Sequence, residues 1–237
     1  MNTLERSVEQ LYEIFSDYPL VPRMNGCPCC VSGTDKEKLH IRPLRDLEEN
    51  DLLRYVFKAL TTWGSIEDFK HFLPRLFEIL AKGGFITYLD TILGKLEYGK
   101  FVMWPENEKA AVKTFLWQWW QNRLATQSYF DHEAFCGIYK TTGELDRMLE
   151  CWETDFQTNG FRVFVDYIDH YYLDMIYDGK NFRDFKRDDI KRINSWIAKN
   201  KDNLEKGFFY FENRETEFTE IISNALFTVE KNYKNLK

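Results

Sequence analysis

Apolar residues recur at helical spacing along nearly the whole of this 237-residue chain, and no segment sustains a strict alternation of apolar and polar residues. Spacings of three and four residues place apolar side chains on one face of a helix, whereas a half-buried strand requires alternation. The main stripes cover residues 4–15, 51–60, 66–80, 112–124, 131–139, 144–152, 161–177, 190–197 and 218–233. The sequence therefore predicts an all-α fold of about ten helices, either a bundle or a HEAT-like stack of helical hairpins.

The clearest hairpin is predicted around Gly64, a residue suited to the turn between two helices. Asn50 is expected to cap the helix before this turn. Ser65 is expected to cap the helix after it, because acidic residues follow in the first turn and favour a helix start. Pro74 lies inside the second helix and should kink it rather than end it.

Other boundaries are predicted from helix-capping and helix-breaking residues. Thr34 is expected to cap a short helix, another helix is expected to end at Leu93 before Gly94, and Pro105 suits the first turn of a long helix. The aromatic run at 208–211 is the one segment with strand-like composition, and it is too short to form a sheet.

Length and composition favour one ordinary globular domain, 1–237, that buries its core without disulfides or metal. Aromatic residues are abundant at 17%, and those left on the surface favour contacts with other proteins. The net charge of −6 argues against a nucleic-acid partner, because an acidic protein repels polyphosphate. A basic or neutral protein is the better match.

The chain also lacks targeting and membrane signals. Its first ten residues include acidic side chains and no continuous apolar stretch, unlike a signal or transit peptide. No run approaches membrane-spanning length. Five cysteines, an odd number, do not suggest a secreted disulfide framework. We therefore expect a cytoplasmic protein with no membrane partner.

The most unusual local feature is the run Gly26-Cys27-Pro28-Cys29-Cys30. Thiolates are good zinc ligands, so this run is a candidate metal site. The candidate ligands are Cys27, Cys29, Cys30 and His40, with Cys136 or Cys151 as more distant alternatives for the fourth position. Structural zinc sites usually pair two separated cysteine units, however, and adjacent cysteines tend to point in different directions. A loop of packed thiols and a redox-active site therefore stay open as alternatives. Apart from zinc at this run, we expect no cofactor.

A second group of candidate residues lies on one predicted helix, where Asp166, Asp169 and His170 share a face. A carboxylate–histidine pair can form a site inside a bundle, but the matching motif on a second helix is missing. Trp117 is the one member of its tryptophan run that falls off the core stripe. We expect these four residues to contact a partner rather than to catalyse a reaction.

No complete catalytic constellation is present. The chain has no Gly-rich phosphate loop, no nucleophile elbow and no kinase signature. Residues 132–136 begin like a zinc-protease helix but carry cysteine in place of the second histidine. His71 lies beside an apolar stripe, where a bridging hydrogen bond is the expected role. These absences favour a protein that is not an enzyme.

Three segments of the first third of the chain resemble a family of uncharacterised bacterial proteins. They are 26–32, the Thr61-Thr62-Trp63-Gly64 run, and the 67–75 segment that includes His71 and Arg75. The resemblance implies a helical, cytosolic protein and supplies no catalytic residues. Some small acidic bacterial proteins of this sort are immunity partners that neutralise a cognate toxin.

These observations together predict a non-catalytic protein-binding protein, most specifically a bacterial immunity protein directed against a basic toxin domain. One alternative is a metal- or thiol-dependent enzyme or sensor that uses Cys27, Cys29 and Cys30. Another alternative is a helical-repeat adaptor in a larger complex, which differs from the first prediction only in its partner.

Overall fold

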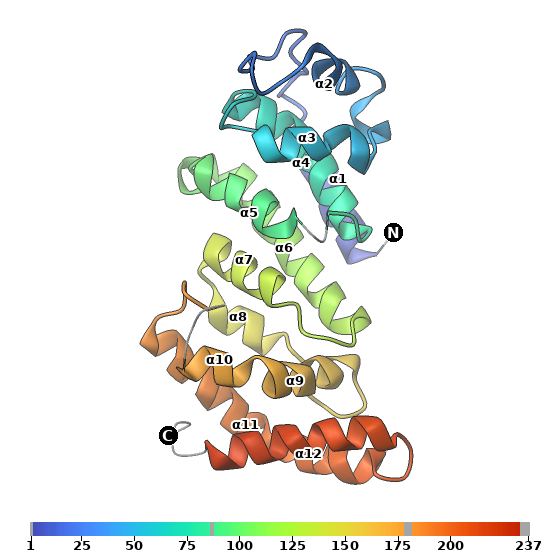
Figure 1. Cartoon of the computed structure of the whole chain (residues 1–237), viewed down its shortest axis with the longest axis vertical. Coiled ribbons are helices and arrows are strands. Elements are labelled where there is room, and N and C mark those ends of the chain that lie inside the picture. The colour runs from blue at the N-terminus through green and yellow to red at the C-terminus, as the bar shows by residue number, and fades with distance from the viewer. Residues whose placement is uncertain (1, 86–87, 178–181, 233–237) are drawn as a thin grey trace. The chain divides into compact units, whose positions relative to one another are not determined.

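The computed structural model describes residues 2–85, 88–177 and 182–232 (Figure 1). Over these residues the chain is all-α, as predicted, with twelve α-helices, two short 3-10 helices and no strand. The only β-type pairings in these ranges are isolated bridges from Trp63 to Gly26 and to Ala59. None of the described helices is both long enough and apolar enough to cross a membrane.

The chain groups into two compact units, Met1–Trp119 and Trp120–Lys237, and the boundary falls within the long helix α6. The first unit contains α1 (Thr3–Ile14), α2 (Gly33–Lys38), η1 (Leu44–Asp46), α3 (Glu49–Lys58), α4 (Ile66–Ala81), α5 (Leu89–Tyr98), η3 (Phe101–Met103) and the start of α6 (Glu106–Thr126). The second unit contains the end of α6, α7 (His132–Thr142), α8 (Leu145–Glu150), α9 (Asn159–His170), α10 (Tyr172–Tyr177), α11 (Arg187–Phe211) and α12 (Thr216–Lys231). The single domain expected from the chain length stays a prediction.

The first unit is organised around α4, against which α1, η1 and α3 pack. Ser65 caps α4, as predicted, and forms a reciprocal capping box with Asp68. Gly64 supplies the turn in the left-handed region, with φ of +76°. Pro74 lies inside α4, which continues to Ala81. The core beside this helix is aromatic, since the Tyr55 ring lies 4.7 Å from that of Phe72.

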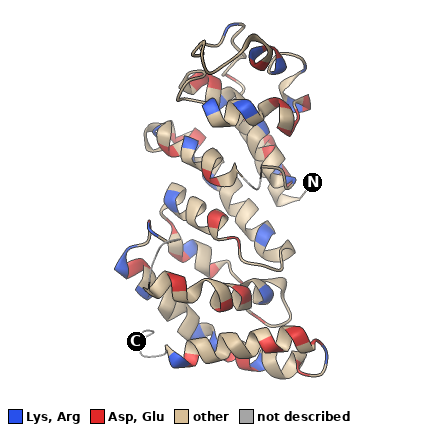
Figure 2. Cartoon of the chain, viewed as in Figure 1, with Lys and Arg blue, Asp and Glu red and all other residues tan. Residues whose placement is uncertain are grey.

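The second unit is organised around Trp152 and the long helices α11 and α12, which lie side by side (Figure 1). The Trp152 ring stacks on Phe130 at 5.6 Å and lies 5.0 Å from Trp196. Its indole N–H donates to the Gly160 carbonyl at 2.9 Å. Helix α9 packs on α12. Lys and Arg are interspersed with Asp and Glu on the helices of each unit (Figure 2).

Several predicted helix starts differ from the observed ones. Helix α3 begins earlier than expected, because Glu48 rather than Asn50 is the N-cap and forms a box with Asp51. Helix α2 is capped by Ser32 rather than by Thr34. In both cases a capping box with an acidic residue three positions on determines the start. Pro105 precedes the first residue of α6 instead of lying within its first turn.

Other details of the helices also differ from the sequence-based expectations. Helix α3 ends at Lys58, because Ala59 leaves the helical region with ψ of 136° and Leu60 then adopts a left-handed φ of +64°. Helix α5 continues through Gly94 to Tyr98, so the expected end at Leu93 is wrong. The aromatic run at 208–211 is the last turn of α11 and not strand-like. The stripe over 161–177 divides into two helices, α9 and α10. The last stripe forms α12, although Tyr233 lies outside the described residues.

Candidate functional site

The run that begins at Gly26 forms a tight turn fastened to the start of the α4 region. The Cys27 N–H donates to the Thr62 carbonyl at 2.8 Å, and the Gly64 N–H donates to the Asn25 carbonyl at 2.7 Å. The N–H groups of Cys30 and Val31 then both donate to the Cys27 carbonyl, at 2.9 and 3.0 Å. The three cysteines are therefore carried by an ordered backbone.

This turn brings three free thiols together. The Sγ atoms of Cys27 and Cys29 are 2.8 Å apart, those of Cys29 and Cys30 are 3.6 Å apart, and all three lie within 4.8 Å of one another. The expectation that the adjacent cysteines point in different directions is wrong, because the turn folds both side chains to one side. Cys29 is exposed and the other two are half-buried.

The thiols perturb one another. A hydrogen bond from Cys29 lowers the pKa of Cys27, because a donor stabilises the thiolate. The same contact, together with the Cys30 thiol, raises the pKa of Cys29 to about 11. Cys27 is therefore the thiol of this pair that ionises first.

Among the described residues, no fourth histidine, cysteine or carboxylate joins this group. His40, the expected fourth ligand, is exposed and lines a neighbouring pocket of about 480 Å³. Cys136 and Cys151 belong to the second unit. Burial raises the pKa of Cys151 to about 11, which makes it a poor thiolate donor.

Trp63 and His71 both make contacts that stabilise the fold. Trp63 is buried, pairs with Gly26 through the β-bridge, and packs edge-on against Tyr55 at 5.4 Å. His71 is half-buried, and its Nδ1 donates a hydrogen bond to the Tyr18 carbonyl at 2.7 Å. Burial lowers the pKa of His71, an effect that this hydrogen bond opposes.

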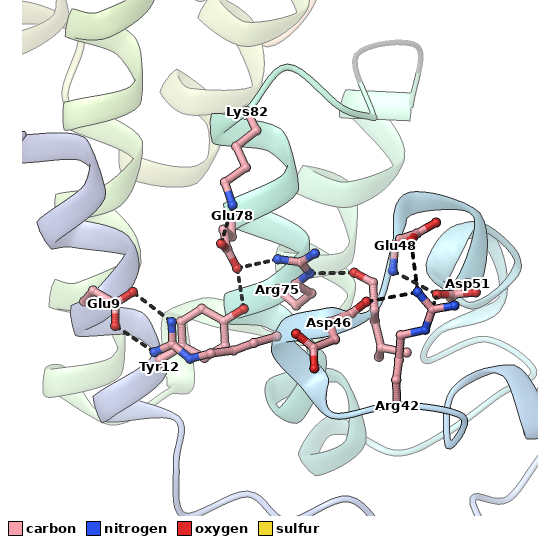
Figure 3. Close-up of polar contacts among 11 residues, drawn as sticks. Glu9, Tyr12, Arg42, Asp46, Glu48, Asp51, Arg75, Glu78 and Lys82 are labelled. Atoms are coloured by element: carbon pink, nitrogen blue, oxygen red, sulfur yellow. Dashed lines mark hydrogen bonds and ion pairs between the residues drawn. The ribbon is translucent and has the colours of Figure 1, made fainter. Parts of the chain in front are cut away.

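Arg75 belongs to a polar network that joins α4 to α1 and to the η1 segment (Figure 3). Its Nε donates to the Leu47 carbonyl at 2.6 Å, and its Nη1 donates to Glu78 at 2.7 Å. Glu78 also accepts from Tyr12 at 2.7 Å and from Lys82 at 2.6 Å. The Nε and Nη1 groups of Arg75 are thus engaged within the first unit.

In the second unit, the structure brings together the expected carboxylate–histidine group on α9. His170 Nδ1 lies 3.1 Å from Asp166 and 3.7 Å from Asp169. The other oxygen of Asp166 accepts the Phe130 N–H at 2.7 Å, so this carboxylate is held in place. Trp117 belongs to the first unit.

Trp117 is buried, with 3% of its surface exposed, although it falls off the core stripe. The cause is that α6 is apolar on more than one side. Its buried apolar residues are Ala111, Val112, Phe115, Leu116, Trp117, Trp119, Trp120 and Leu124. A helix that is apolar around most of its circumference buries residues outside a single stripe.

Asp166 also lines a surface pocket of about 520 Å³ between α9 and the start of α12. The lining residues are Ser128, Arg162, Asp166, Glu215, Thr216, Glu217, Phe218 and Ile221. Arg162 is bound to both carboxylate oxygens of Glu215, at 2.6 and 2.7 Å, and its guanidinium lies 4.3 Å from the centre of the Phe218 ring. One cation therefore faces three carboxylates.

Sequence reasoning missed Arg162, Glu215 and Glu217. The i,i+4 spacing of Arg162 and Asp166 on α9 was a detectable signal. Nothing in the sequence indicated that Glu215, 53 positions after Arg162, would lie beside it.

No family model, no curated protein and no solved structure matches the chain. The bacterial family resemblance of the first third therefore stays an expectation.

Proposed function

We propose that the chain is a non-catalytic protein-binding protein that receives a basic side chain of its partner in the pocket between α9 and α12. The observation that carries this proposal is the combination of acidic and apolar groups in that pocket. Asp166, Glu215 and Glu217 line it together with Phe218 and Ile221. A lysine or arginine side chain has the matching form, with an apolar stem and a cationic end.

The charge balance of the pocket favours a cation. Arg162 is committed to Glu215 through two short hydrogen bonds. Asp166 is fixed by the Phe130 N–H at 2.7 Å, and the Nδ1 atom of His170 lies 3.1 Å from its other oxygen. Glu217 forms no ion pair within the described ranges. Two carboxylates thus stay available to an incoming ammonium or guanidinium group.

The pocket is also open enough for a partner side chain. Its volume of about 520 Å³ falls in the usual range of binding pockets, roughly 300–1,000 Å³. The net charge of −6 would steer a basic protein toward the chain and speed its association. In its most specific form, the proposal is a bacterial immunity protein that neutralises a basic toxin domain.

The partner can be identified by placing a photo-crosslinking amino acid at Thr216, on the pocket wall, in the native host. The crosslinked protein is then purified and its affinity measured by calorimetry for the unmodified chain and for Glu217→Gln. Glu220→Gln is the matched control, since Glu220 is exposed on the same helix and does not line the pocket. We expect Glu217→Gln to weaken binding about tenfold and Glu220→Gln to leave it within about twofold.

An acidic partner, or equal affinities for the two variants, would contradict the proposal. The immunity form has its own test, in which the identified partner is expressed in a sensitive host. Co-expression of the chain should restore growth, and the Asp166→Lys and Glu217→Lys double variant should not. If expression of the partner alone does not inhibit growth of the host, the partner is not a toxin and the immunity form of the proposal is excluded.

A further inference from the structure

The thiol turn of the first unit has no part in the proposed binding pocket, yet its geometry is that of a ligand set. Cys27 and Cys30 stand at the two ends of a hydrogen-bonded turn, with Cys29 between them. The turn is anchored at its N-terminal end by the backbone hydrogen bonds of Cys27 to Thr62 and of Gly64 to Asn25. Three sulfur atoms are therefore gathered before any ligand arrives, which reduces the ordering cost of binding one.

The sulfur spacing suits a single metal ion. Thiolates bound at about 2.3 Å from one ion lie roughly 4 Å from each other. The observed separations are 2.8 and 3.6 Å, and the whole group lies within 4.8 Å. Small rotations of exposed or half-buried side chains are enough to place all three sulfurs around one ion.

The position of these thiols argues against a role as apolar packing. Met24 and Val31, on either side of the run, are buried at 4% and 5% exposure. Cys29 is exposed, and Cys27 and Cys30 are half-buried, between these two core residues. The chain therefore presents its thiols at the surface where the neighbouring apolar residues turn inward.

Two cationic side chains, Arg54 and Lys36, lie beside the turn. Arg54 Nη2 donates to the Cys30 carbonyl at 3.0 Å. Lys36 reaches Gly26, since its Cε is 3.4 Å from the position of a β-carbon there. Lys36, Arg23 and His40 line the adjoining pocket of about 480 Å³. Three thiolates around one ion leave a net negative charge, which nearby cations stabilise.

We propose that the turn of Cys27, Cys29 and Cys30 binds one thiophilic d10 metal ion through its three sulfur atoms. Thiolates select Cu(I) and Zn(II) among the metals available to proteins. Copper(I) is satisfied by three thiolates, whereas zinc prefers four ligands and would need water in the fourth position. Within the described residues no side chain supplies that fourth ligand, so copper(I) is the better fit.

The test uses the full-length, reduced protein under anaerobic conditions. Copper(I) is titrated in competition with a chromophoric copper(I) chelator, and zinc is titrated separately against a zinc indicator. We expect about one copper(I) ion per chain to be withheld from the chelator. X-ray absorption at the copper edge should report three sulfur neighbours.

Two variants make the result specific. The Cys27→Ser, Cys29→Ser, Cys30→Ser triple variant should lose the ion, and the Cys136→Ser, Cys151→Ser double variant should keep it. Far-UV circular dichroism checks that both retain their helices. If the unmodified chain retains zinc but not copper(I), and the triple variant loses the zinc, the three thiols still form the metal site but zinc is the preferred metal. The proposal is overturned if neither metal is withheld, or if the triple variant binds as well as the unmodified chain.

Discussion

The ion pair between Lys70 on α4 and Glu108 on α6 provides a sharp test of how the first unit is stabilised. Lys70 Nζ lies 2.6 Å from Glu108, and the two side chains are only 9% and 5% exposed. Tyr18 donates to the same carboxylate at 2.5 Å and accepts from Lys70 at 3.0 Å. The Lys70 ammonium also lies 4.6 Å from the centre of the Trp104 ring. We propose replacing each charged residue by methionine, separately and together.

The expected magnitudes follow from the burial of both charges. At a separation of 2.6 Å, the attraction is roughly 6 kcal/mol for an effective dielectric constant of about 20. Desolvation costs several kcal/mol for each ion, so the intact pair is close to neutral for stability. Removing one partner leaves the other charge buried, so Lys70→Met and Glu108→Met should each cost about 3–5 kcal/mol. The double variant should be close to the unmodified chain or more stable by up to about 4 kcal/mol.

The assay is urea unfolding of the four proteins, followed by far-UV circular dichroism and compared at equal denaturant slopes. The four proteins form a double-mutant cycle, whose coupling energy measures the interaction between the two side chains. The separate effect of Glu108 on the start of α6 cancels, because Glu108→Met is made both with and without Lys70. Single variants that each cost less than about 1 kcal/mol, with additive effects, would refute the reasoning. That outcome would mean that water reaches both charges.

Two further predictions concern acid stability and helix packing. Burial would raise the pKa of Glu78, but the hydrogen bonds from its three neighbours prevail and lower it from 4.5 to about 2. Its stabilising contribution is therefore complete above about pH 4.5 and is lost as the pH falls toward 2. In a plot of the unfolding midpoint against pH, Glu78→Gln should make the decrease at acid pH less steep. A methyl group at Gly207 in α11 would overlap the Phe161 ring, whereas one at Gly94 in α5 meets nothing within 4 Å. Thermal or urea unfolding should show Gly207→Ala destabilised by about 1–3 kcal/mol and Gly94→Ala stabilised by about 1 kcal/mol; the same sign for both would contradict this packing.

The helical content of the chain could be predicted because it depends on local periodicity. The Ser65 cap and the turn at Gly64 were also predictable, since the capping box and the glycine turn are encoded within four residues. The errors arose where a neighbouring signal was stronger. Glu48 replaced Asn50 as a cap because it pairs with Asp51. Helix α3 ended where Ala59 and then Leu60 left the helical region, in backbone conformations that their residue types do not reveal.

The candidate sites were predictable only in their local parts. The cysteines were found because they are adjacent in sequence, but their convergence depends on a turn fastened to Thr62, which the sequence alone does not indicate. The group around Asp166 was found from helical spacing, while Glu215 and Glu217 came from a helix that is distant in sequence. Tertiary pairing of this kind has no signature in a single sequence.

Binding of a basic partner at the pocket between α9 and α12 is the central feature of the proposed function. Hydrogen–deuterium exchange of the chain, alone and with its crosslink-identified partner, tests this claim most directly because it maps the contact along the backbone. We predict that protection on binding is concentrated in α9 around Arg162 and Asp166 and in the first turns of α12. Protection confined to the thiol turn or to other helices, with α9 and α12 unchanged, would contradict it.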